Sequence, residues 1–355
     1  MKILYAYRYG IVGGVSTQLL LRQKALKSAG HQAFLFFSQD NGLGQVLADR
    51  NRIFFGSEMS FQKLVRQEQF DAVVVIDSPE LLAAASGPIF QRNPVYLDVH
   101  TTTDTGLSYL HDLDATRLAG VMVPTNYSAA LVGQRLGDSV DIQVVPNILN
   151  TEVFHPDVED IPAGALTLPE FVWVGKLDNH KNWRLALVYA GMLNDLLGGI
   201  RLHVVGGYTA PPKRAEEFFE LASRLGISNS VNWFDRVENT TLAGLYKRCA
   251  SSGGAMLVTS RDESFGMAAA ESLLCGCSLI ANDLPVFREV FPSMPLVKLV
   301  DIWDPEQVAN AVQQLASLDE YEALVGQVYK QLGSRYGAGA FVESFLSMLG
   351  EHRSQ

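Results

Sequence analysis

Cysteine is scarce in this chain of 355 residues, which contains only Cys249, Cys275 and Cys277. Three cysteines are too few for a disulfide framework, and none of them shows the Cys-x-x-Cys spacing of a zinc knuckle. We therefore expect core thiols in a reducing cytoplasm and no metal site built on cysteine.

Long apolar runs are also lacking, since no stretch approaches the roughly 20 apolar residues of a membrane span. Residues 1–7 enter a strand pattern directly, without the charged leader, apolar run and cleavage site of a secretory signal. We expect a cytoplasmic protein without a transmembrane segment, for which peripheral contact with a membrane stays open.

Positive charge is in deficit, because 28 Lys and Arg face 38 Asp and Glu and the formal net charge is -10. This balance opposes nonspecific attraction to a polyanion, so nucleic acid is not an expected partner and an anionic ligand must be held by local groups. The Gly-x-Gly-x-x-Gly fingerprint is missing from both halves, which disfavours a nicotinamide dehydrogenase.

The sequence does contain a regular alternation of short apolar runs with helical patterns, typical of βαβ units around a parallel sheet. With 48% hydrophobic and 19% charged residues, this length suggests two globular domains of α/β class. In the first half the pattern predicts a helix at Val15–Ala29 and strands at Lys2–Tyr7, His31–Phe37, Asp71–Asp77, Val95–His100, Gly120–Pro124 and Ile142–Pro146.

A second βα series follows a polar, proline-containing segment at Asn147–Leu168, which we interpret as an interdomain linker. Strands are predicted at Phe171–Gly175, Arg201–Gly206, Ser230–Phe234, Ala255–Ser260, Ser278–Ala281 and Leu296–Val300. Helices are predicted at Asn182–Leu197, Pro212–Leu225, Thr241–Cys249, Met267–Cys275 and Pro305–Leu318, and a tail at Glu320–Leu349 is predicted to be helical in two pieces broken at Gly333–Gly339. The result is two doubly wound domains, at 1–150 and 151–333.

Ligands of open α/β sheets bind beyond the carboxyl ends of the strands, where helix N-termini favour anions. In the first half, Gly13 and Gly14 follow the first strand and open the first helix, so a phosphate could approach the backbone there. The same pair would also suit a tight strand-to-helix connection.

A sharper pattern lies between a strand and a helix in the second half, where Glu263 and Glu271 are separated by eight positions. Along a helix this spacing is about 12 Å, which is long for a pair of glycosidase carboxylates. It suits two anchors at opposite ends of a nucleotide sugar, one on the sugar and one on the ribose. The plain alternative is two carboxylates that face solvent.

A diphosphate between those anchors needs cations, and Lys176 and Lys181 lie on the loop that leaves the first strand of the second half. If both point inward, they neutralise the charge of a departing diphosphate without a metal. Taken alone, the two lysines would be more typical of a solvated loop than of a binding site.

The combined pattern resembles the retaining glycosyltransferases of family 4 over essentially the whole chain. The residues that carry the resemblance are Gly13-Gly14, Val145-Pro146-Asn147, Phe154-His155-Pro156, Val174-Gly175-Lys176, Lys181, Glu263 to Met267, Glu271-Ser272, Cys275-Gly276-Cys277 and Glu289. The resemblance implies the GT-B fold: two doubly wound Rossmann-like domains that face each other across a cleft. Residues 1–150 would bind the acceptor, 151–333 the nucleotide sugar, and a helix within 334–355 would cross back to the first domain.

The resemblance also assigns roles to single residues. It implies that Glu263 contacts hydroxyls of the transferred sugar, that Glu271 takes the ribose hydroxyls, and that Lys176 and Lys181 hold the diphosphate. His100 falls where family members place a histidine near the donor sugar. Further donor contacts are expected at Gly13, Gly14, Ser264, Phe265, Gly266 and Met267, and at Arg236 and Val237 beside the nucleobase.

The implied reaction is a same-face transfer without a cofactor or metal, in which the diphosphate leaves while the acceptor hydroxyl arrives beside it. The expected donor is UDP- or GDP-linked, and the acceptor is a small molecule, a lipid-linked molecule or a glycan. The chain departs from the family pattern at Lys176 in place of Arg, Asn182 and Ser264 in place of Gly, and Ser278 in place of Pro.

Three alternatives stay open. Asp112-Leu113-Asp114 has the Asp-x-Asp form of a metal-dependent transferase of the other major fold. A nucleotide-sugar 2-epimerase would share the architecture and convert the donor with no acceptor. A noncatalytic nucleotide-sugar-binding protein would keep the cleft without turnover.

Overall fold

The computed structural model describes residues 1–47, 49–85, 92–156, 167–207, 210–316 and 320–351. Their contacts divide the chain into two compact units, Met1–Ile148 with Tyr336–Gln355 and Leu149–Arg335. The domain limits expected from the sequence are 150 and 333, and residues 157–166, ten of the 22 residues in the predicted linker, lie outside the described residues. No helix among the described residues is both long and apolar enough to span a membrane.

The first unit contains a seven-stranded sheet in the order β3-β2-β1-β4-β5-β6-β7. All its strand pairs are parallel. The strands are β1 (Lys2–Gly10), β2 (Gln32–Asp40), β3 (Ile53–Phe55), β4 (Ala72–Ile76), β5 (Val95–Asp98), β6 (Gly120–Val123) and β7 (Ile142–Val144). The helices are α1 (Gly14–Ser28), α2 (Leu43–Val46), α3 (Glu58–Gln67), α4 (Pro79–Ala84), α6 (Asp104–Leu107), α7 (Asn126–Leu136) and α15 (Ala338–Glu351), with short 3-10 helices η1 (Ser108–Asp112), η2 (Ala115–Arg117) and η3 (Gly137–Ser139).

The second unit contains a six-stranded sheet in the order β10-β9-β8-β11-β12-β13, again with parallel pairs throughout. Its strands are β8 (Glu170–Val174), β9 (Arg201–Val205), β10 (Val231–Phe234), β11 (Ala255–Val258), β12 (Ser278–Asn282) and β13 (Val297–Val300). Its helices are α8 (Trp183–Leu197), α9 (Pro212–Arg224), α10 (Asn239–Ser251), α11 (Met267–Leu274), α12 (Pro285–Val290), α13 (Pro305–Ala316) and α14 (Tyr321–Tyr336). The prediction of an α/β chain with two doubly wound parallel sheets is confirmed.

Each sheet reverses its winding direction beside its first strand. In the first sheet β1 lies between β2 and β4, and in the second sheet β8 lies between β9 and β11. Such a switch point opens a crevice at the carboxyl ends of the strands, where α/β proteins bind their ligands. The loops after β1, β4, β8 and β11 are therefore the places to examine for a site.

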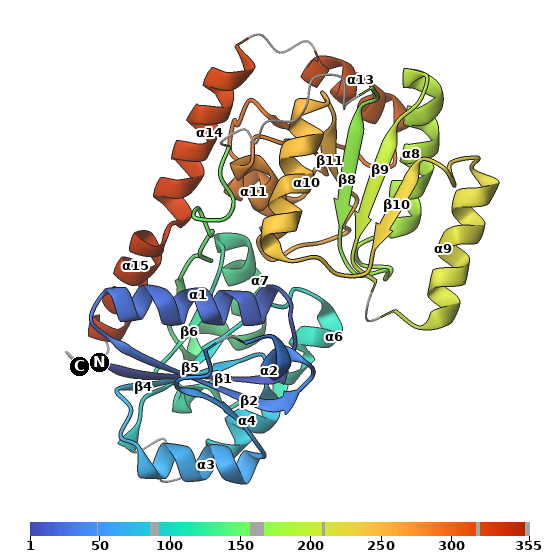
Figure 1. Cartoon of the computed structure of the whole chain (residues 1–355). Coiled ribbons are helices and arrows are strands. Elements are labelled where there is room, and N and C mark those ends of the chain that lie inside the picture. Colours follow the sequence, from blue (N-terminus) through green and yellow to red (C-terminus); the bar gives the residue numbers. More distant parts are fainter. Residues whose placement is uncertain (48, 86–91, 157–166, 208–209, 317–319, 352–355) are drawn as a thin grey trace. The chain divides into compact units, whose positions relative to one another are not determined.

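The central strand β4 is apolar along its whole length, as expected where helices cover both faces of a parallel sheet. In β4 all five residues, Ala72 to Ile76, are fully buried. The helix α15 packs against α1 in the first unit (Figure 1), and its Phe341, Phe345 and Met348 join the core on that face of the sheet.

The tail is helical in two pieces, α14 and α15, as the sequence predicted, but the break between them is narrower than expected. The break predicted across 333–339 is confined to the single bend at Gly337, because α14 continues through Gly333 to Tyr336. A helix tolerates an internal glycine at a cost of about 1 kcal/mol. The strand β3 was not predicted, since its three residues are too short to show an alternating pattern.

Candidate active site

In the second unit, the loops that follow β8 and β11 meet through an ion pair between Lys181 and Glu263. The two side chains are only 26% and 13% exposed, so their charges interact with reduced solvent screening. The Ser260 hydroxyl donates a second hydrogen bond of 2.7 Å to the same carboxylate oxygen, Oε1. The structure thus brings together two residues that the sequence predicted separately.

Backbone contacts hold this pair in place. The Lys181 N–H donates to Asp178 Oδ1 at 2.8 Å, which closes a tight turn before α8. The Thr259 hydroxyl donates to the carbonyl oxygens of Lys181 and Asn182 at 3.0 and 3.1 Å, and the Arg261 N–H donates to the His180 carbonyl at 2.9 Å. The two loops therefore form one cross-linked surface at the switch point of the sheet.

Glu271 lies one turn into α11, the helix that follows the Glu263 loop. Its carboxyl group makes no hydrogen bond or ion pair with any residue in the described ranges. Burial raises the pKa of Glu271 to about 8. A carboxyl group that is held without a partner is suited to accept hydrogen bonds from a ligand.

The segment from Glu263 to Gly266 is not helical, so the spacing of about 12 Å that assumed one continuous helix does not apply between Glu263 and Glu271. Gly266 immediately precedes α11 and has a φ of 88°, and a Cβ there would overlap the Phe287 ring. A glycine is required at this position by both the backbone and the packing. Phe265 is buried in the core, whereas Ser264 and Met267 are partly exposed.

The remaining predicted residues of this unit lie apart from the ion pair. Lys176 is exposed and forms no ion pair with a described residue. Arg236 and Val237 follow β10, the edge strand, which two strands separate from β11. Arg236 is exposed and Val237 is partly exposed.

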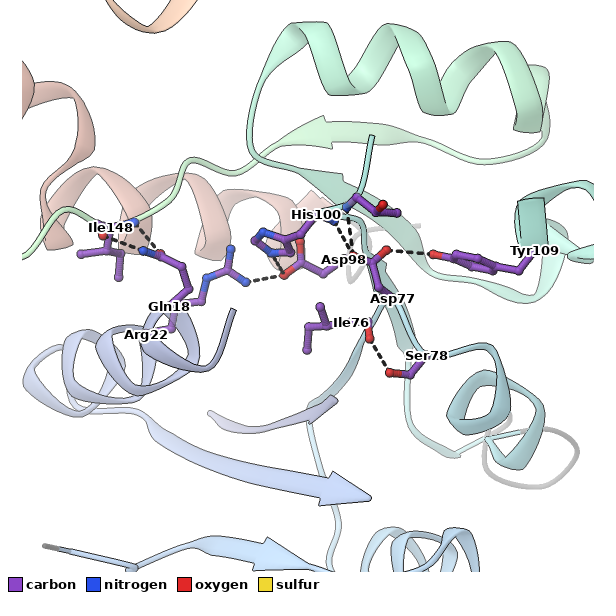
Figure 2. Close-up of polar contacts among 10 residues, drawn as sticks. Gln18, Arg22, Ile76, Asp77, Ser78, Asp98, His100, Tyr109 and Ile148 are labelled. Atoms are coloured by element: carbon purple, nitrogen blue, oxygen red, sulfur yellow. Dashed lines mark hydrogen bonds and ion pairs between the residues drawn. The ribbon is translucent and has the colours of Figure 1, made fainter. Parts of the chain in front are cut away.

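In the first unit, a second polar cluster lies at the ends of β4 and β5 (Figure 2). His100 Nε2 contacts Asp98 Oδ2 at 3.1 Å, and the same oxygen accepts a hydrogen bond from Arg22 Nη1 of α1. Burial alone would raise the pKa of Asp98, but the Arg22 guanidinium and His100 outweigh it and hold that pKa at about 2. Asp98 is therefore ionised over the physiological range.

Asp77 fixes the backbone next to this cluster (Figure 2). Its Oδ2 accepts the N–H groups of His100 and Thr101 at 2.9 and 3.1 Å, and its Oδ1 accepts the Tyr109 hydroxyl at 3.2 Å. Burial raises the pKa of Asp77 to about 6, against the lowering effect of His100.

Gly13 and Gly14 lie at the start of α1, where the helix begins with free backbone N–H groups. Gly13 has an extended φ of -172°, which any residue adopts, and a Cβ on Gly14 would meet nothing within 4 Å among the described residues. Neither the backbone nor the packing of the described chain requires glycine here, so the space above this turn is available to a ligand.

Residues 161–330 match the family model described as Glycosyl transferases group 1. The match covers 170 of the 355 residues, a little less than half of the chain. The matched segment includes Lys181, Glu263 and Glu271, whereas Gly13, Gly14 and His100 precede it.

Two D-inositol 3-phosphate glycosyltransferases are similar to the chain. The protein of Segniliparus rotundus is 24% identical over 214 residues, which cover 59% of this chain and 47% of that protein. The protein of Rhodococcus opacus is 32% identical over 200 residues, which cover 54% of this chain and 44% of that protein. The chain thus spans about half the length of the curated relatives it matches.

Solved structures with the same fold extend over both units. The structure of Anabaena HepE in complex with UDP and glucose has a TM-score of 0.79 and 16% identity, and covers 99% of this chain and 100% of that chain. Sucrose-phosphate synthase from Thermosynechococcus elongatus has a TM-score of 0.77 and 16% identity, with 100% and 99% covered. The GT-B fold predicted from the sequence is confirmed.

Two departures of the matched segment from the family pattern have local explanations. Asn182 adopts a φ of 54°, and asparagine is among the few residues besides glycine that tolerate this conformation. The Ser278 hydroxyl lies 3.1 Å from the Tyr321 hydroxyl, which in turn donates to the Gly276 carbonyl at 2.6 Å. Ser278 thereby links β12 to α14.

Sequence reasoning missed several polar residues of the two clusters. Asp77 directly follows β4 and Asp98 ends β5, and the two strands are parallel neighbours. Their place at the strand ends could have indicated that both belong to the site. The sequence around Arg22 and Tyr109 gives no such signal. Arg22 reaches Asp98 from α1, and Tyr109 reaches Asp77 from η1. The Asp-x-Asp alternative falls on exposed residues, of which Asp114 is bound to Arg117 at 2.8 Å.

Proposed function

We propose that this protein is a retaining glycosyltransferase, which moves a sugar from a nucleoside diphosphate to an acceptor hydroxyl without a metal ion. The proposal rests above all on the ion pair of Lys181 with Glu263 at the switch point of the second sheet, inside the group 1 segment. This pair offers a cation for a diphosphate and a carboxylate for sugar hydroxyls in one place.

The neighbouring groups suggest how a donor would be distributed over the second unit. Lys181 and the exposed Lys176 would balance the diphosphate, and such local cations matter in a chain with a net charge of -10. Glu263 would accept hydrogen bonds from hydroxyls of the sugar. The carboxyl of Glu271, which has no partner among the described residues, would accept those of the ribose. Arg236 and Val237 would lie beside the base.

The first unit would contribute its two strand-end features. The open turn at Gly13 and Gly14 offers backbone N–H groups of α1 to a phosphate oxygen. His100 offers an imidazole to a hydroxyl of the donor sugar.

In the proposed reaction the acceptor oxygen bonds to the anomeric carbon on the face from which the diphosphate departs. The bond from that carbon to the diphosphate oxygen breaks, and the proton of the acceptor hydroxyl passes to the leaving phosphate. Lys181 and the amides near Gly14 would stabilise the charge that develops there, which is the largest single contribution in many enzymes.

UDP-glucose is the first donor to test, because the HepE structures contain UDP with glucose or UDP-glucose. GDP-linked sugars complete the panel. D-inositol 3-phosphate is one acceptor to include, because the similar relatives are named for it. Lipid-linked molecules and glycans represent the other acceptor classes.

The experiment has two stages. A thermal-shift screen of the full chain identifies the nucleotide sugar that raises Tm, since a ligand of the folded state stabilises it. Transfer from that donor is then assayed over the acceptor panel, with and without EDTA, and the product anomer is determined by NMR. The proposal requires a product of retained configuration and a rate that EDTA leaves unchanged. Conversion of the donor without an acceptor would identify an epimerase, and binding without any conversion a noncatalytic protein.

A further inference from the structure

His100 is held at its ring by one neighbouring aspartate and at its backbone by another (Figure 2). Nε2 lies 3.1 Å from Asp98 Oδ2, and the backbone N–H donates to Asp77 Oδ2 at 2.9 Å. The other ring nitrogen, Nδ1, makes no hydrogen bond with a residue in the described part of the chain. The imidazole therefore has one occupied and one available nitrogen.

The charge of Asp98 decides which nitrogen carries the proton. A carboxylate only accepts hydrogen bonds, so a neutral imidazole at this distance donates its Nε2–H to Asp98 and keeps a lone pair on Nδ1. The reverse tautomer would place two lone pairs against each other.

Arg22 keeps Asp98 charged in a place where a charge is costly. The side chains of Arg22 and Asp98 are 0% and 1% exposed, and burying such a pair costs desolvation energy that only a close partner offsets. Arg22 Nη1 is that partner.

The remaining contacts of Arg22 indicate that it acts on Asp98 alone. Its guanidinium lies 5.2 Å from the Phe341 ring of α15 and 5.9 Å from the Tyr5 ring. Its Nε and Nη2 atoms are buried and have no hydrogen-bond partner among the described residues. Among the described residues, its polar contact is with the carboxylate that holds His100.

We propose that Asp98, held by Arg22, is a positioning residue for His100, which fixes the imidazole with Nε2 protonated and Nδ1 free to accept a hydrogen bond from a sugar hydroxyl. This inference rests on the proposed function for the identity of the hydroxyl, but the tautomer itself does not. Arg22 and Asp98 touch no substrate in this proposal. They act through His100, and α15 covers them through Phe341.

The tautomer is tested directly by NMR of the full chain with ¹⁵N-labelled histidine. The chain has seven histidines, so the His100 signals are assigned by their loss in His100→Gln. Protonated and unprotonated ring nitrogens have well-separated shifts, and we expect Nε2 protonated and Nδ1 unprotonated in the neutral imidazole. The opposite tautomer, or an even mixture in the wild type, would overturn the proposal. This result does not depend on activity.

The kinetic test is a double-mutant cycle of Asp98→Asn with His100→Ala, with transfer as the readout. We expect Asp98→Asn alone to lower kcat by about tenfold to a hundredfold, the range found for partners that orient metal ligands. In the His100→Ala background the same change should have little effect, because the residue it positions is gone. A merely structural role would lower kcat equally in both backgrounds, and that result would refute positioning.

Controls separate this inference from the proposed function. Asp138→Asn makes the same chemical change at an exposed position in the same unit and should leave kcat unchanged. If Asp98→Asn does not fold, Arg22→Lys keeps a buried cation and should retain the tautomer while lowering kcat less. Arg22→Lys with a reversed tautomer would count against the proposal. If the wild type transfers no sugar, the proposed function fails, and the NMR result still decides the tautomer.

Discussion

Lys181 and Glu263 form an ion pair although 82 residues separate them in the sequence. They meet because β8 and β11 are neighbours in a parallel sheet, so the loops at their carboxyl ends lie at the same edge. In the proposed reaction Lys181 faces two anions, the carboxylate and the diphosphate. Its positive charge is needed most when the diphosphate departs.

Lys181→Ala should therefore impair catalysis far more than folding. We expect kcat to fall by about 100-fold to 1000-fold, the cost of removing one donor to a developing anion. The free energy of unfolding should fall by less than about 1 kcal/mol, since partly exposed ion pairs contribute little. Steady-state kinetics and urea unfolding measure the two effects.

The matched control is Lys213→Ala, which removes an exposed lysine of the same unit at the start of α9. It should change neither quantity. Unaltered transfer kinetics in Lys181→Ala would refute the role of Lys181 at the diphosphate.

Glu271 should couple donor binding to proton release. Burial raises its pKa to about 8 in the free protein, and hydroxyl donors of a bound ribose would stabilise the charged form and lower that pKa. The affinity for UDP should then increase as the pH rises from 7 to 8 and level off above that. Calorimetry in two buffers of different ionisation enthalpy would detect the released proton.

Glu271→Gln is the control for this effect, because any protonation of UDP itself contributes equally to the pH profiles of both proteins. The variant should bind UDP more weakly, with the increase between pH 7 and 8 removed. The coupling would be disproved by parallel pH profiles of the two proteins.

Gly14→Ala should lower activity without lowering stability, whereas a substitution in the core lowers stability. A Cβ at Gly14 meets nothing within 4 Å in the described structure, and alanine is favoured over glycine in a helix by about 1 kcal/mol. Tm should stay constant or rise. If a phosphate packs on this turn, the methyl group displaces it, and kcat/KM should fall by about 100-fold. Full activity together with a raised Tm would show that the open space is unused.

The fold was accessible to sequence analysis because its strands are short apolar runs at regular intervals. The run Ala72 to Ile76 contains only Val, Ile and Ala, a composition that favours a buried strand over other secondary structure. The Glu263 loop was recognisable for a similar reason, since acidic, aromatic and glycine residues follow a buried strand in a fixed order. The helix α3 was missed although Phe61, Leu64 and Val65 show the spacing of an amphipathic helix.

The pairing of Arg22 with Asp98 could not be predicted from any local pattern. In the sequence Arg22 looks like a residue of the exposed face of α1, and it is buried only because β5 places a carboxylate beneath it, 76 residues away. Edge strand β3 was missed because its pairing of Leu35 with Ile53, and not its own sequence, defines it.

Asp77 should make the protein less stable as the pH rises from about 4 to about 6. An unfolded aspartate loses its proton near pH 3.9, whereas burial raises the folded pKa of Asp77 to about 6. Between these values the folded state holds a proton that the unfolded state has released, so the free energy of unfolding falls with increasing pH. Asp77→Asn keeps an acceptor for the His100 and Thr101 N–H groups and should flatten this decline. Calorimetric Tm values at pH 4.5 and 6.5, compared with those of Asp138→Asn, measure the difference, and an equal pH dependence in all three proteins would contradict it.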